Sequence, residues 1–387
     1  MNLIRKLKTI VGDEDRSWGM GSSVEQKHIN GTPQKNKVLV INYEKHKDPA
    51  DAALKKMRVG VVGFGVVGSA TAKGLQKLGN LVYINDVKNL EPHEEEFRIM
   101  KEYDLSKVDL TMLCLPTPTL YSEKGGHIDL SFLEQEIEHM GERLHHYHSK
   151  KGNHDYKTFV IRSTVIPGTT RKLGSLLEQK SKKKLGSDFG IAMNPEFLRA
   201  YNNDEDFLKP RATVIGQYDK RAGDQLFEAY KNLPSENKKI FRVSLEEAEM
   251  AKYAHNIYNA MKISAFNELH LMTEQISKNL HKDLSFFSRN GYGPNFERIR
   301  DIMLSTTEAL WNPQYGTHAG VAYGGTCLPK DTNALLSFLR EEHGIDPKVL
   351  AATIEINEVM KTRKNPEIIG KDYFQKRQHP SYDNLKY

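Results

Sequence analysis

One short stretch of this sequence, residues 323–331, concentrates side chains that could do covalent chemistry. It contains Cys327, one of two cysteines in 387 residues, and the glycines Gly324 and Gly325 precede it closely. Glycine allows a backbone to turn tightly and to approach a ligand, because it carries no Cβ atom. The stretch could therefore present a thiol to a bound substrate.

The residues after Cys327 favour ionisation of its thiol. Pro329 is suited to the first turn of a helix, which we expect over residues 333–340. The positive end of that helix and the ammonium of Lys330 both favour a thiolate, and Asp331 adds a carboxylate to the same turn. This combination predicts covalent catalysis on a carbonyl group. A buried structural cysteine at a loop–helix junction is the alternative.

A second motif, Gly63-Phe64-Gly65-Val66-Val67-Gly68, lies between an apolar strand pattern at residues 57–62 and a helical pattern. The next predicted strand, residues 81–85, ends at Asp86, which lies 18 residues after the last glycine, Gly68. Glycines with this spacing between a strand and a helix are typical of dinucleotide sites. Asp86 would accept hydrogen bonds from the adenosine ribose, which predicts NAD rather than NADP as the cofactor.

Each glycine of this motif has a separate physical purpose. Gly63 permits the tight turn, Gly65 lets the backbone approach a pyrophosphate, and Gly68 lets the helix pack on the strand. The pyrophosphate is then expected at the helix N-terminus, beside the amides of Val66 and Val67.

Predicted strands and helices alternate through the following residues, with strands at 109–115, 158–163, 189–193, 212–215 and 239–243. This order predicts an α/β fold, a Rossmann-type doubly wound parallel sheet with helices on both faces. Such sheets bind ligands beyond the carboxyl ends of their strands. Side chains just past those ends are Thr117, Thr119, Thr164 and Glu196. Each threonine could instead be a turn hydroxyl that bonds its own backbone.

A long helix is expected after residue 244. Ser244 and Glu247 fit a capping box, and apolar residues recur at helical spacing to residue 276 without a proline. A helix of this length, about 45 Å, usually joins domains or forms a subunit interface, which predicts a homodimer. Lys252 and Asn256 lie one turn apart on one face and could polarise a substrate oxygen. An ordinary solvated pair is the alternative.

These patterns divide the chain into four parts: a partly disordered N-terminal extension, residues 1–56; an NAD-binding domain, residues 57–243; an all-helical central and dimerisation domain, residues 244–345; and a linker helix with a polar tail, residues 346–387. Within the extension we expect a short basic amphipathic helix at residues 2–11 and a single strand at residues 38–43.

Composition excludes several classes of protein. The net charge of +6, from 56 basic and 50 acidic residues, suits an anionic substrate but does not by itself indicate a nucleic-acid-binding protein. No apolar run of about 18 residues occurs, so no membrane span is expected. Two distant cysteines argue against a disulfide scaffold and for a reducing compartment, the cytoplasm.

Three other features suggest structure rather than chemistry. Cys114 lies within an apolar strand pattern and is expected in the core. The histidines near residue 146 lack a thiolate or carboxylate at ligand spacing, so we expect no metal site; they are His145, His146, His148 and His154. The lysine run at residues 182–184 is expected to be a solvated loop.

Taken together, the motifs resemble the UDP-glucose/GDP-mannose dehydrogenase family over about residues 57–361, most closely its UDP-glucose 6-dehydrogenases. The shared motifs occur in the same order along the chain: residues 63–68, 115–119, 163–165, 194–198, 249–253 with Asn256, and 324–331. The cysteine motif is the most specific of them.

The resemblance implies an NAD-dependent, four-electron oxidation of a sugar C6 alcohol to a carboxylate. Cys327 would add to the intermediate aldehyde, and the resulting thiohemiacetal would be oxidised to a thioester that water hydrolyses. Lys252 and Asn256 would stabilise the oxyanion, Asp331 and Thr164 would position water, and Glu196 would act as the general base. The substrate's diphosphate agrees with the basic net charge.

The resemblance also assigns binding roles. Cofactor contacts are expected from Gly63, Gly65, Val66, Val67, Gly68, Asp86, Thr117, Thr119, Thr164 and Lys330. Substrate contacts are expected from Glu196, Phe197, Leu198, Lys252, Asn256, Tyr315, Gly324 and Gly325. No metal is implied.

Two departures from the family pattern keep alternatives open. Ala200 stands where the family has a second glutamate, and the sequence ends before the family's carboxyl-terminal nucleotide-binding domain. UDP-glucose is the first choice of substrate, with GDP-mannose or a UDP-N-acetylhexosamine as alternatives. A non-catalytic, NAD-binding dimeric relative is a further alternative. A simple 3-hydroxyacid dehydrogenase would share the sheet but would not need Cys327.

Overall fold

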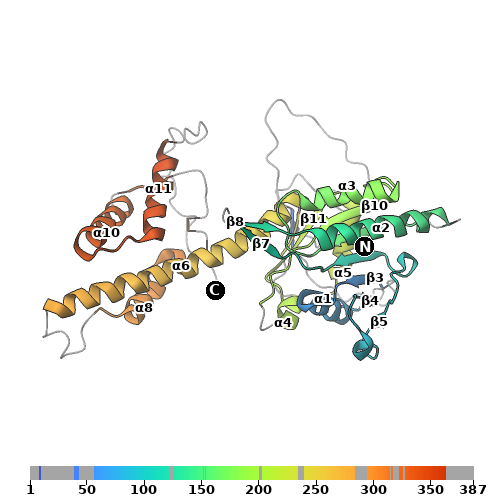
Figure 1. Ribbon diagram of the computed structural model, residues 1–387, viewed down its shortest axis with the longest axis horizontal. Helices are drawn as coiled ribbons and strands as arrows, with labels where there is room; N and C mark the ends of the chain where they lie inside the picture. The colour runs from blue at the N-terminus through green and yellow to red at the C-terminus, as the bar shows by residue number, and fades with distance from the viewer. Residues whose placement is uncertain are drawn as a thin grey trace. The chain divides into compact units, whose positions relative to one another are not determined.

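The computed structural model describes residues 8–9, 39–42, 56–122, 125–150, 152, 154–199, 203–233, 239–283, 294–313, 315–316, 322–325 and 327–362. The chain divides into two compact units, Met1–His255 and Asn256–Tyr387, and each is described by itself. The boundary falls inside α6, Leu245–Asp283, the longest helix that the structure describes (Figure 1).

The described residues of the first unit form one ten-stranded sheet, in the order β1-β2-β12-β11-β10-β9-β6-β3-β4-β5. The strands are β1 Lys8–Thr9, β2 Leu39–Asn42, β3 Arg58–Val62, β4 Leu81–Asn85, β5 Arg98–Ile99, β6 Leu110–Leu113, β9 Lys157–Ile161, β10 Phe189–Met193, β11 Ala212–Gln217 and β12 Lys239–Val243. All strands from β10 to β5 in this order are parallel, as predicted. A separate antiparallel hairpin joins β7, Thr119–Ser122, to β8, Gly125–Ile128.

The last two strands of the alternating pattern depart from a purely parallel sheet. β11 runs antiparallel to β10 and parallel to β12. Its end overlaps the end of β10, because Met193 pairs with Gly216 and Ala192 with Gln217. Val243 at the end of β12 pairs with Gly216, so β12 finishes level with the carboxyl end of β10. The helix that follows β12 therefore starts at the edge where ligands bind in such sheets.

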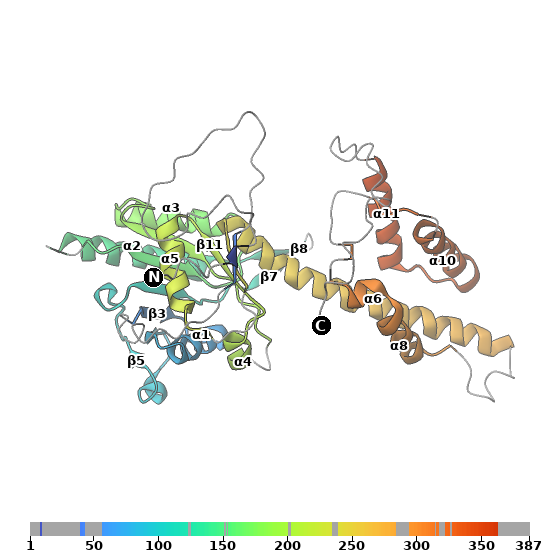
Figure 2. The same cartoon turned by 180° about the vertical axis from the view of Figure 1, so that it is seen from behind.

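Helices cover both faces of the sheet, which is the predicted doubly wound arrangement (Figure 1). One face carries α2, Ser131–Ser149, and α3, Thr169–Ser181. The other carries α1, Val66–Lys77, α4, Asn203–Leu208, and α5, Lys220–Tyr230. Figure 2 shows the same layers from behind. Two short 3₁₀ turns, Glu91–His93 and Leu105–Lys107, lie in the connections.

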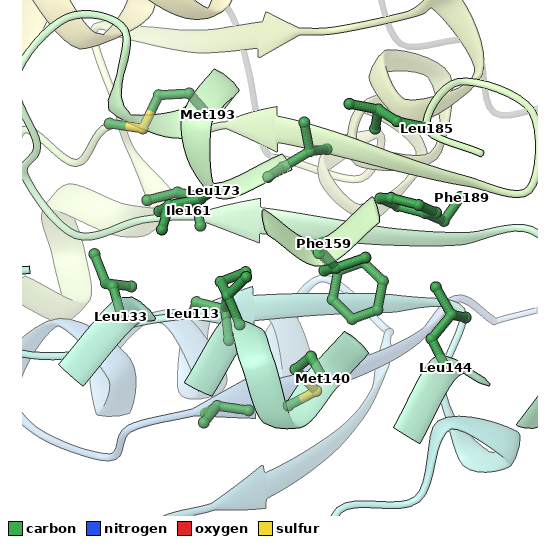
Figure 3. Close-up of a cluster of buried hydrophobic side chains, with 14 of the residues drawn as sticks. Leu113, Leu133, Met140, Leu144, Phe159, Ile161, Leu173, Leu185, Phe189 and Met193 are labelled. Carbon is green, nitrogen blue, oxygen red and sulfur yellow. The ribbon is translucent and has the colours of Figure 1, made fainter. Parts of the chain in front are cut away.

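The core under α2 and α3 explains why these segments are helical. The buried residues of α2 recur at intervals of three and four, which places them on one stripe: Leu133, Ile137, Met140 and Leu144. That stripe packs on Phe159 of β9 and Phe189 of β10, whose rings meet edge to face with centroids 6.2 Å apart (Figure 3). Each fully buried side chain of this size stabilises the fold by about 1.5–3 kcal/mol.

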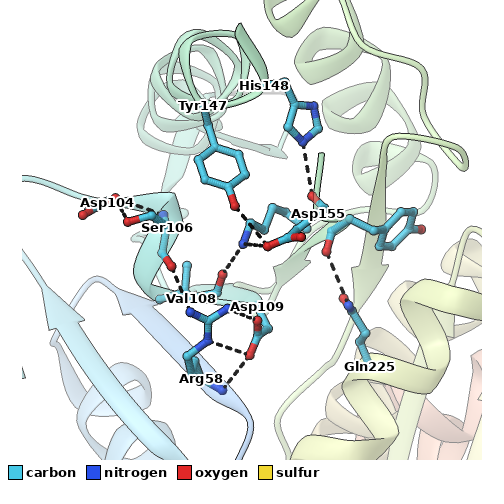
Figure 4. Close-up of polar contacts among 11 residues, drawn as sticks. Arg58, Asp104, Ser106, Val108, Asp109, Tyr147, His148, Asp155 and Gln225 are labelled. Carbon is cyan, nitrogen blue, oxygen red and sulfur yellow. Dashed lines mark hydrogen bonds and ion pairs between the residues drawn. The ribbon is translucent and has the colours of Figure 1, made fainter. Parts of the chain in front are cut away.

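A polar cluster at the amino end of the sheet surrounds the buried Lys157, whose neighbours Val108, Tyr147 and Asp155 are labelled in Figure 4. Lys157 is 2% exposed, and its ammonium donates to the carbonyl of Val108 at 2.8 Å and lies 4.7 Å from the centre of the Tyr147 ring. Burial lowers the pKa of Lys157, although nearby Asp155 raises it. This cluster lies at the edge of the sheet opposite the predicted site, and its contacts join β9 to Val108 and to Tyr147 of α2.

The predictions for the N-terminal extension have mixed outcomes. The expected strand at residues 38–43 is confirmed by β2, which pairs antiparallel with β12. The expected helix at residues 2–11 is wrong at Lys8–Thr9, which form a strand paired with β2. Two residues are too few to show a period of two in a sequence, so the basic, mixed composition suggested a helix instead. The rest of this extension lies outside the described residues.

The described part of the second unit is helical, as predicted. Besides the later part of α6 it contains α8 Phe296–Thr306, α9 Glu308–Trp311, α10 Leu328–His343 and α11 Lys348–Thr362. The carboxylate of Glu268 on α6 accepts hydrogen bonds from two amides in the first turn of α11, those of Val349 and Leu350, at 2.8 and 2.9 Å. The polar tail after residue 362 lies outside the described residues. Among the helices that the structure describes, none has a stretch long and apolar enough to cross a bilayer.

Candidate active site

The glycine motif forms the turn between β3 and α1. Gly63 has a left-handed backbone, φ 87°, and a Cβ atom there would lie 2.5 Å from the carbonyl oxygen of Cys114. A Cβ atom on Gly68 would lie 1.8 Å from the carbonyl oxygen of Gly63, whereas one on Gly65 would meet nothing within 4 Å. The protein itself thus requires glycine at positions 63 and 68, and the open side of Gly65 leaves room for a ligand.

The N-terminus of α1 suits an anion. The helix begins at Val66, its preceding residue Gly65 has no side chain to cap it, and its first turn holds no acidic residue. The amides at the start of a helix, here those of Val66 and Val67, carry a partial positive charge and need acceptors. The residues present therefore fit the pyrophosphate of a dinucleotide.

Asp86 follows β4 directly and lies beside the glycine turn. One of its carboxylate oxygens accepts from the amide of Phe64 at 2.5 Å, and the other accepts from the amide of Lys88 at 2.9 Å. The carboxylate is thereby fixed next to the motif, in the position that the sequence predicted. Its contact with a ribose remains a prediction.

Two of the predicted threonines meet at the carboxyl edge of the sheet. The hydroxyl of Thr117, after β6, donates to the carbonyl of Thr164, after β9, at 2.9 Å. The hydroxyl of Ser163 donates to the carbonyl of Leu115 at 2.6 Å and joins the same two loops. Thr117 therefore bonds another loop rather than its own turn. Thr119 begins β7 and is exposed.

A buried arginine, Arg162, is hydrogen-bonded to the loop that carries Glu196. Arg162 is 4% exposed and donates to Thr71 of α1 at 2.7 Å and to Tyr230 at 3.1 Å. It also bonds the side chain of Asn194, whose amide group donates to the carbonyl of Val214 at 2.8 Å. The hydroxyl of Tyr230 donates to the same Asn194 side-chain oxygen at 2.6 Å, so three residues hold Asn194 two positions before Glu196.

Lys252 and Glu196 form an ion pair at this edge. The Lys252 ammonium donates to a Glu196 oxygen at 2.8 Å, and the two side chains are 8% and 14% exposed. The other Glu196 oxygen accepts from the amide of Leu198 at 2.7 Å. Lys252 also lies 5.7 Å from the centre of the Phe197 ring, which meets His255 edge on. The structure thus brings together four residues that the sequence assigned to the substrate.

Asn256 follows Lys252 by one turn in α6 and is exposed. The alternative of a solvated Lys–Asn pair is wrong for Lys252, because this lysine is buried against Glu196.

The predicted capping box at the start of α6 is confirmed. The amide and hydroxyl of Ser244 donate to Glu247 at 2.8 Å, and the amide of Glu247 donates to the Ser244 hydroxyl at 3.2 Å.

In the second unit, Cys327 is the residue that immediately precedes α10, and it is exposed. Pro329 lies in the first turn of this helix, and the left-handed backbone expected for a glycine occurs at Gly325, φ 80°. Lys330 pairs with Asp331 at 2.5 Å, and both side chains are largely exposed. The cysteine therefore has the helix-start position that the sequence predicted.

The backbone before the cysteine is fixed by an asparagine of α11. Asn357 is 4% exposed; its side-chain oxygen accepts from the amide of Tyr323 at 2.7 Å, and its amide group donates to the carbonyl of Tyr323 at 3.2 Å. Gly324 follows this clamped residue directly. Tyr315 is 45% exposed.

Sequence reasoning missed three residues that support the candidate site, Arg162, Glu249 and Asn357. Glu249 belongs to the motif that carries Lys252, but nothing in the local pattern shows that its side chain is buried. Arg162 lies in the predicted strand at residues 158–163 and Asn357 in the predicted linker helix, and the local sequence at neither position shows the distant hydrogen-bond partner. Ala200, where the family pattern has glutamate, lies outside the described residues.

Cys114 and the histidines near residue 146 make structural contacts where the structure describes them. Cys114 packs against the core, as predicted, and burial raises the pKa of its thiol to about 11. His145 and His148 bond the backbone carbonyls of Ser181 and Asp155, at 3.0 and 3.2 Å. Within the described ranges, no group of three or more potential ligands is arranged around a metal position.

Two family models match this chain. Residues 87–234 match the NAD-binding domain of the UDP-glucose/GDP-mannose dehydrogenase family, and residues 246–293 and 289–359 match its central domain.

Characterised relatives and solved structures agree with these matches. The chain is 33% identical to a GDP-mannose 6-dehydrogenase of Pseudomonas syringae pv. syringae over 72% of this chain and 63% of that protein. It is 30% identical to UDP-glucose 6-dehydrogenase AglM of Haloferax volcanii over 78% of this chain and 70% of that protein. The fold is similar to a GDP-mannose dehydrogenase from Pseudomonas aeruginosa in a ternary complex, with a TM-score of 0.65 and 27% identity over 79% of this chain and 69% of that one. The chain thus spans less than two thirds of the length of the Pseudomonas syringae relative.

Proposed function

Because this chain belongs to the UDP-glucose/GDP-mannose dehydrogenase family, we propose that it oxidises the C6 alcohol of a nucleotide sugar to a carboxylate with two NAD molecules in turn. The observation that carries the proposal is the buried Lys252–Glu196 pair at the carboxyl edge of an NAD-binding sheet. A lysine and a carboxylate held at 2.8 Å supply a cation for an oxyanion and a base for water.

The glycine turn and Asp86 are proposed to hold the cofactor. The open side of Gly65 leaves room for the pyrophosphate, the amides at the uncapped start of α1 donate hydrogen bonds to it, and Asp86 accepts hydrogen bonds from the ribose hydroxyls. NAD supplies the hydride acceptor for both oxidation steps. Thr117, Thr119, Thr164 and Lys330 are proposed as its further contacts.

Cys327 is proposed as the nucleophile of the second half-reaction. Its sulfur adds to the aldehyde carbon left by the first oxidation, and the aldehyde oxygen takes a proton. Loss of a hydride and a proton from this thiohemiacetal gives a thioester, and water then releases the acid and regenerates the thiol. Lys252 and Asn256 stabilise the oxyanion, Glu196 accepts the proton from water, and Asp331 and Thr164 position that water. Phe197, Leu198, Tyr315, Gly324 and Gly325 are proposed as sugar contacts.

UDP-glucose is our first choice of substrate, because the order and spacing of the motifs most resemble those of UDP-glucose 6-dehydrogenases. GDP-mannose is the second, favoured by the 33% identity to GDP-mannose 6-dehydrogenases and by the TM-score of 0.65. A UDP-N-acetylhexosamine is a third. We assign the NAD-binding domain to residues 57–243 and the central domain to residues 244–345.

We also propose that the chain acts as a cytoplasmic homodimer through α6. Support comes from large apolar side chains exposed on this helix, including Ile257 at 49%, Tyr258 at 64% and Met261 at 58%. Patches of this kind mark protein interfaces. Met261→Glu should shift the mass measured by light scattering to that of a monomer.

The deciding experiment counts NADH formed per sugar consumed to completion, for wild type and Cys327→Ser. UDP-glucose, GDP-mannose and UDP-N-acetylglucosamine are compared at equal concentration. Two NADH per sugar, with the variant stalled before the free acid appears, supports the proposal and identifies the sugar. One NADH with an unaffected variant would indicate a simple alcohol dehydrogenase. NAD binding without turnover of any sugar would indicate the non-catalytic relative.

A further inference from the structure

Glu249 is the most deeply buried carboxylate on the first turns of α6. It is 0% exposed and lies three residues before Lys252. Its two oxygens accept from the amide of Gly168 at 2.5 Å and from the amide of Thr170 at 2.6 Å. Within the described residues, no lysine or arginine forms an ion pair with it, so these backbone donors compensate the buried carboxylate.

These amides belong to the start of α3, which has no cap of its own. The residue before the helix is Gly168, with φ 93° and no side chain, and the first turn holds no acidic residue. The first amides of a helix have no acceptor inside the helix and carry its partial positive charge. Glu249, far along the chain, therefore provides the acceptor that the local sequence lacks.

The same turn of α6 also carries Lys252. Glu249 binds the segment that follows β9, and Lys252 binds Glu196 in the segment that follows β10. One helical turn is thus fixed to two neighbouring loops of the carboxyl edge. A shift of this turn would move the backbone of Lys252 and so draw its ammonium away from Glu196.

We propose that Glu249 is a positioning residue, which caps α3 and thereby holds the Lys252 ammonium at Glu196. The consequence for turnover rests on the proposed function, whereas the effect on the placement of Lys252 does not. A displacement of about 1 Å at a reacting group can cost on the order of 100-fold in rate.

The test compares Glu249→Gln with Glu246→Gln. Glu246 joins the same two helices, because its carboxylate binds Arg171 of α3 at 2.6 Å, but this pair is exposed. Both substitutions exchange a carboxylate for an amide on α6. Glutamine at position 249 presents an NH₂ group to one of two backbone donors and so loses one of the two bonds.

The first readout is the rate of Lys252 acetylation, followed by peptide mass spectrometry on the full chain. Lys262, which is exposed on the same helix, is the internal standard. We expect Lys252 to be labelled at least about fivefold faster in Glu249→Gln and unchanged in Glu246→Gln. Glu249→Asp keeps the charge but is one methylene shorter, so it should give an intermediate rate of labelling. This variant replaces Glu249→Gln in the test if the glutamine variant does not fold.

The second readout is turnover below the melting temperature of each variant. We expect kcat to fall at least about tenfold in Glu249→Gln while the Kd for NAD stays within twofold of wild type. Unchanged labelling of Lys252 in both position-249 variants would overturn the proposal, and so would a lowered melting temperature with unchanged kcat. Faster labelling in a chain that oxidises no nucleotide sugar would uphold the positioning and refute the proposed function.

Discussion

The ammonium of Lys252 lies 2.8 Å from a carboxylate oxygen of Glu196, although 56 residues separate them in the sequence. The contact exists because β12 ends level with the carboxyl end of β10, so α6 begins at the loop that contains Glu196. Both side chains are largely removed from water, which strengthens their attraction and makes each depend on the other.

Lys252→Met is expected to leave the buried Glu196 carboxylate without its cation. Turnover should fall at least about 100-fold, because an oxyanion loses its stabilising charge. The free energy of unfolding, measured in urea, should fall by about 3 kcal/mol. Lys262→Met, an exposed change on the same helix, is the control and should alter stability by less than about 0.5 kcal/mol. Full activity in the position-252 variant would remove Lys252 from the mechanism.

Alanine at Gly65 and alanine at Gly68, both in the turn into α1, should have different effects. In Gly68→Ala the new methyl group would overlap the Gly63 carbonyl, so we expect a loss of about 1–3 kcal/mol in the free energy of unfolding. In Gly65→Ala the methyl group meets no protein atom, so stability should be unchanged while the Kd for NAD rises at least about tenfold. Calorimetry and fluorescence titration measure the two effects. Normal NAD binding by Gly65→Ala would place the pyrophosphate elsewhere.

Acid should weaken the polar cluster at the amino end of the sheet through Asp109. Burial alone raises the pKa of Asp109, but hydrogen bonds from the Arg58 side chain and amide outweigh it and lower the pKa overall (Figure 4). A carboxylate with a lowered folded-state pKa contributes stability that is present above its unfolded pKa, near 4, and is lost as pH falls through the folded value.

Asp109→Asn should therefore cost about 1–3 kcal/mol at pH 7, and this difference from wild type should shrink below pH 4. Urea unfolding at pH 7, 5, 4 and 3.5 measures it. Glu102→Gln, an exposed change nearby, should show no difference at any pH. A difference that stays constant down to pH 3.5 would contradict the role of the Asp109 charge.

Asn357→Ala should loosen the segment that leads to Cys327. Both hydrogen bonds to the Tyr323 backbone disappear, so we expect about 1–3 kcal/mol of destabilisation and at least a twofold change in alkylation of Cys327 by iodoacetamide. Peptide mass spectrometry separates Cys327 from Cys114, whose raised pKa of about 11 keeps its thiol protonated. Glu355→Ala, exposed on the same helix, is the control. Equal alkylation in both variants would show that Asn357 does not govern the cysteine.

Much of this architecture was accessible from the sequence because buried strands and amphipathic helices have different periods. The strand–turn–helix at Gly63, the cap at Ser244 and the helix start at Cys327 all depend on neighbouring residues, and each was predicted. The reversal of β11 was not, because a fully buried strand has the same apolar run in either direction. Glu249 was missed for a similar reason, since a glutamate on a helix looks solvated until its distant partner at Gly168 is known.

The short seam between β10 and β11 has a consequence for the motions of the folded protein. β9 and β10 are paired along the whole of both strands, whereas β10 meets β11 through the pairs at Ala192 and Met193. In native-state hydrogen exchange, β11, β12 and the turn of α6 that bears Lys252 should behave as one cooperative segment that opens before the parallel strands from β10 to β5 do. The free energy of that opening then sets the fraction of molecules in which Lys252 and Glu196 are apart at any moment.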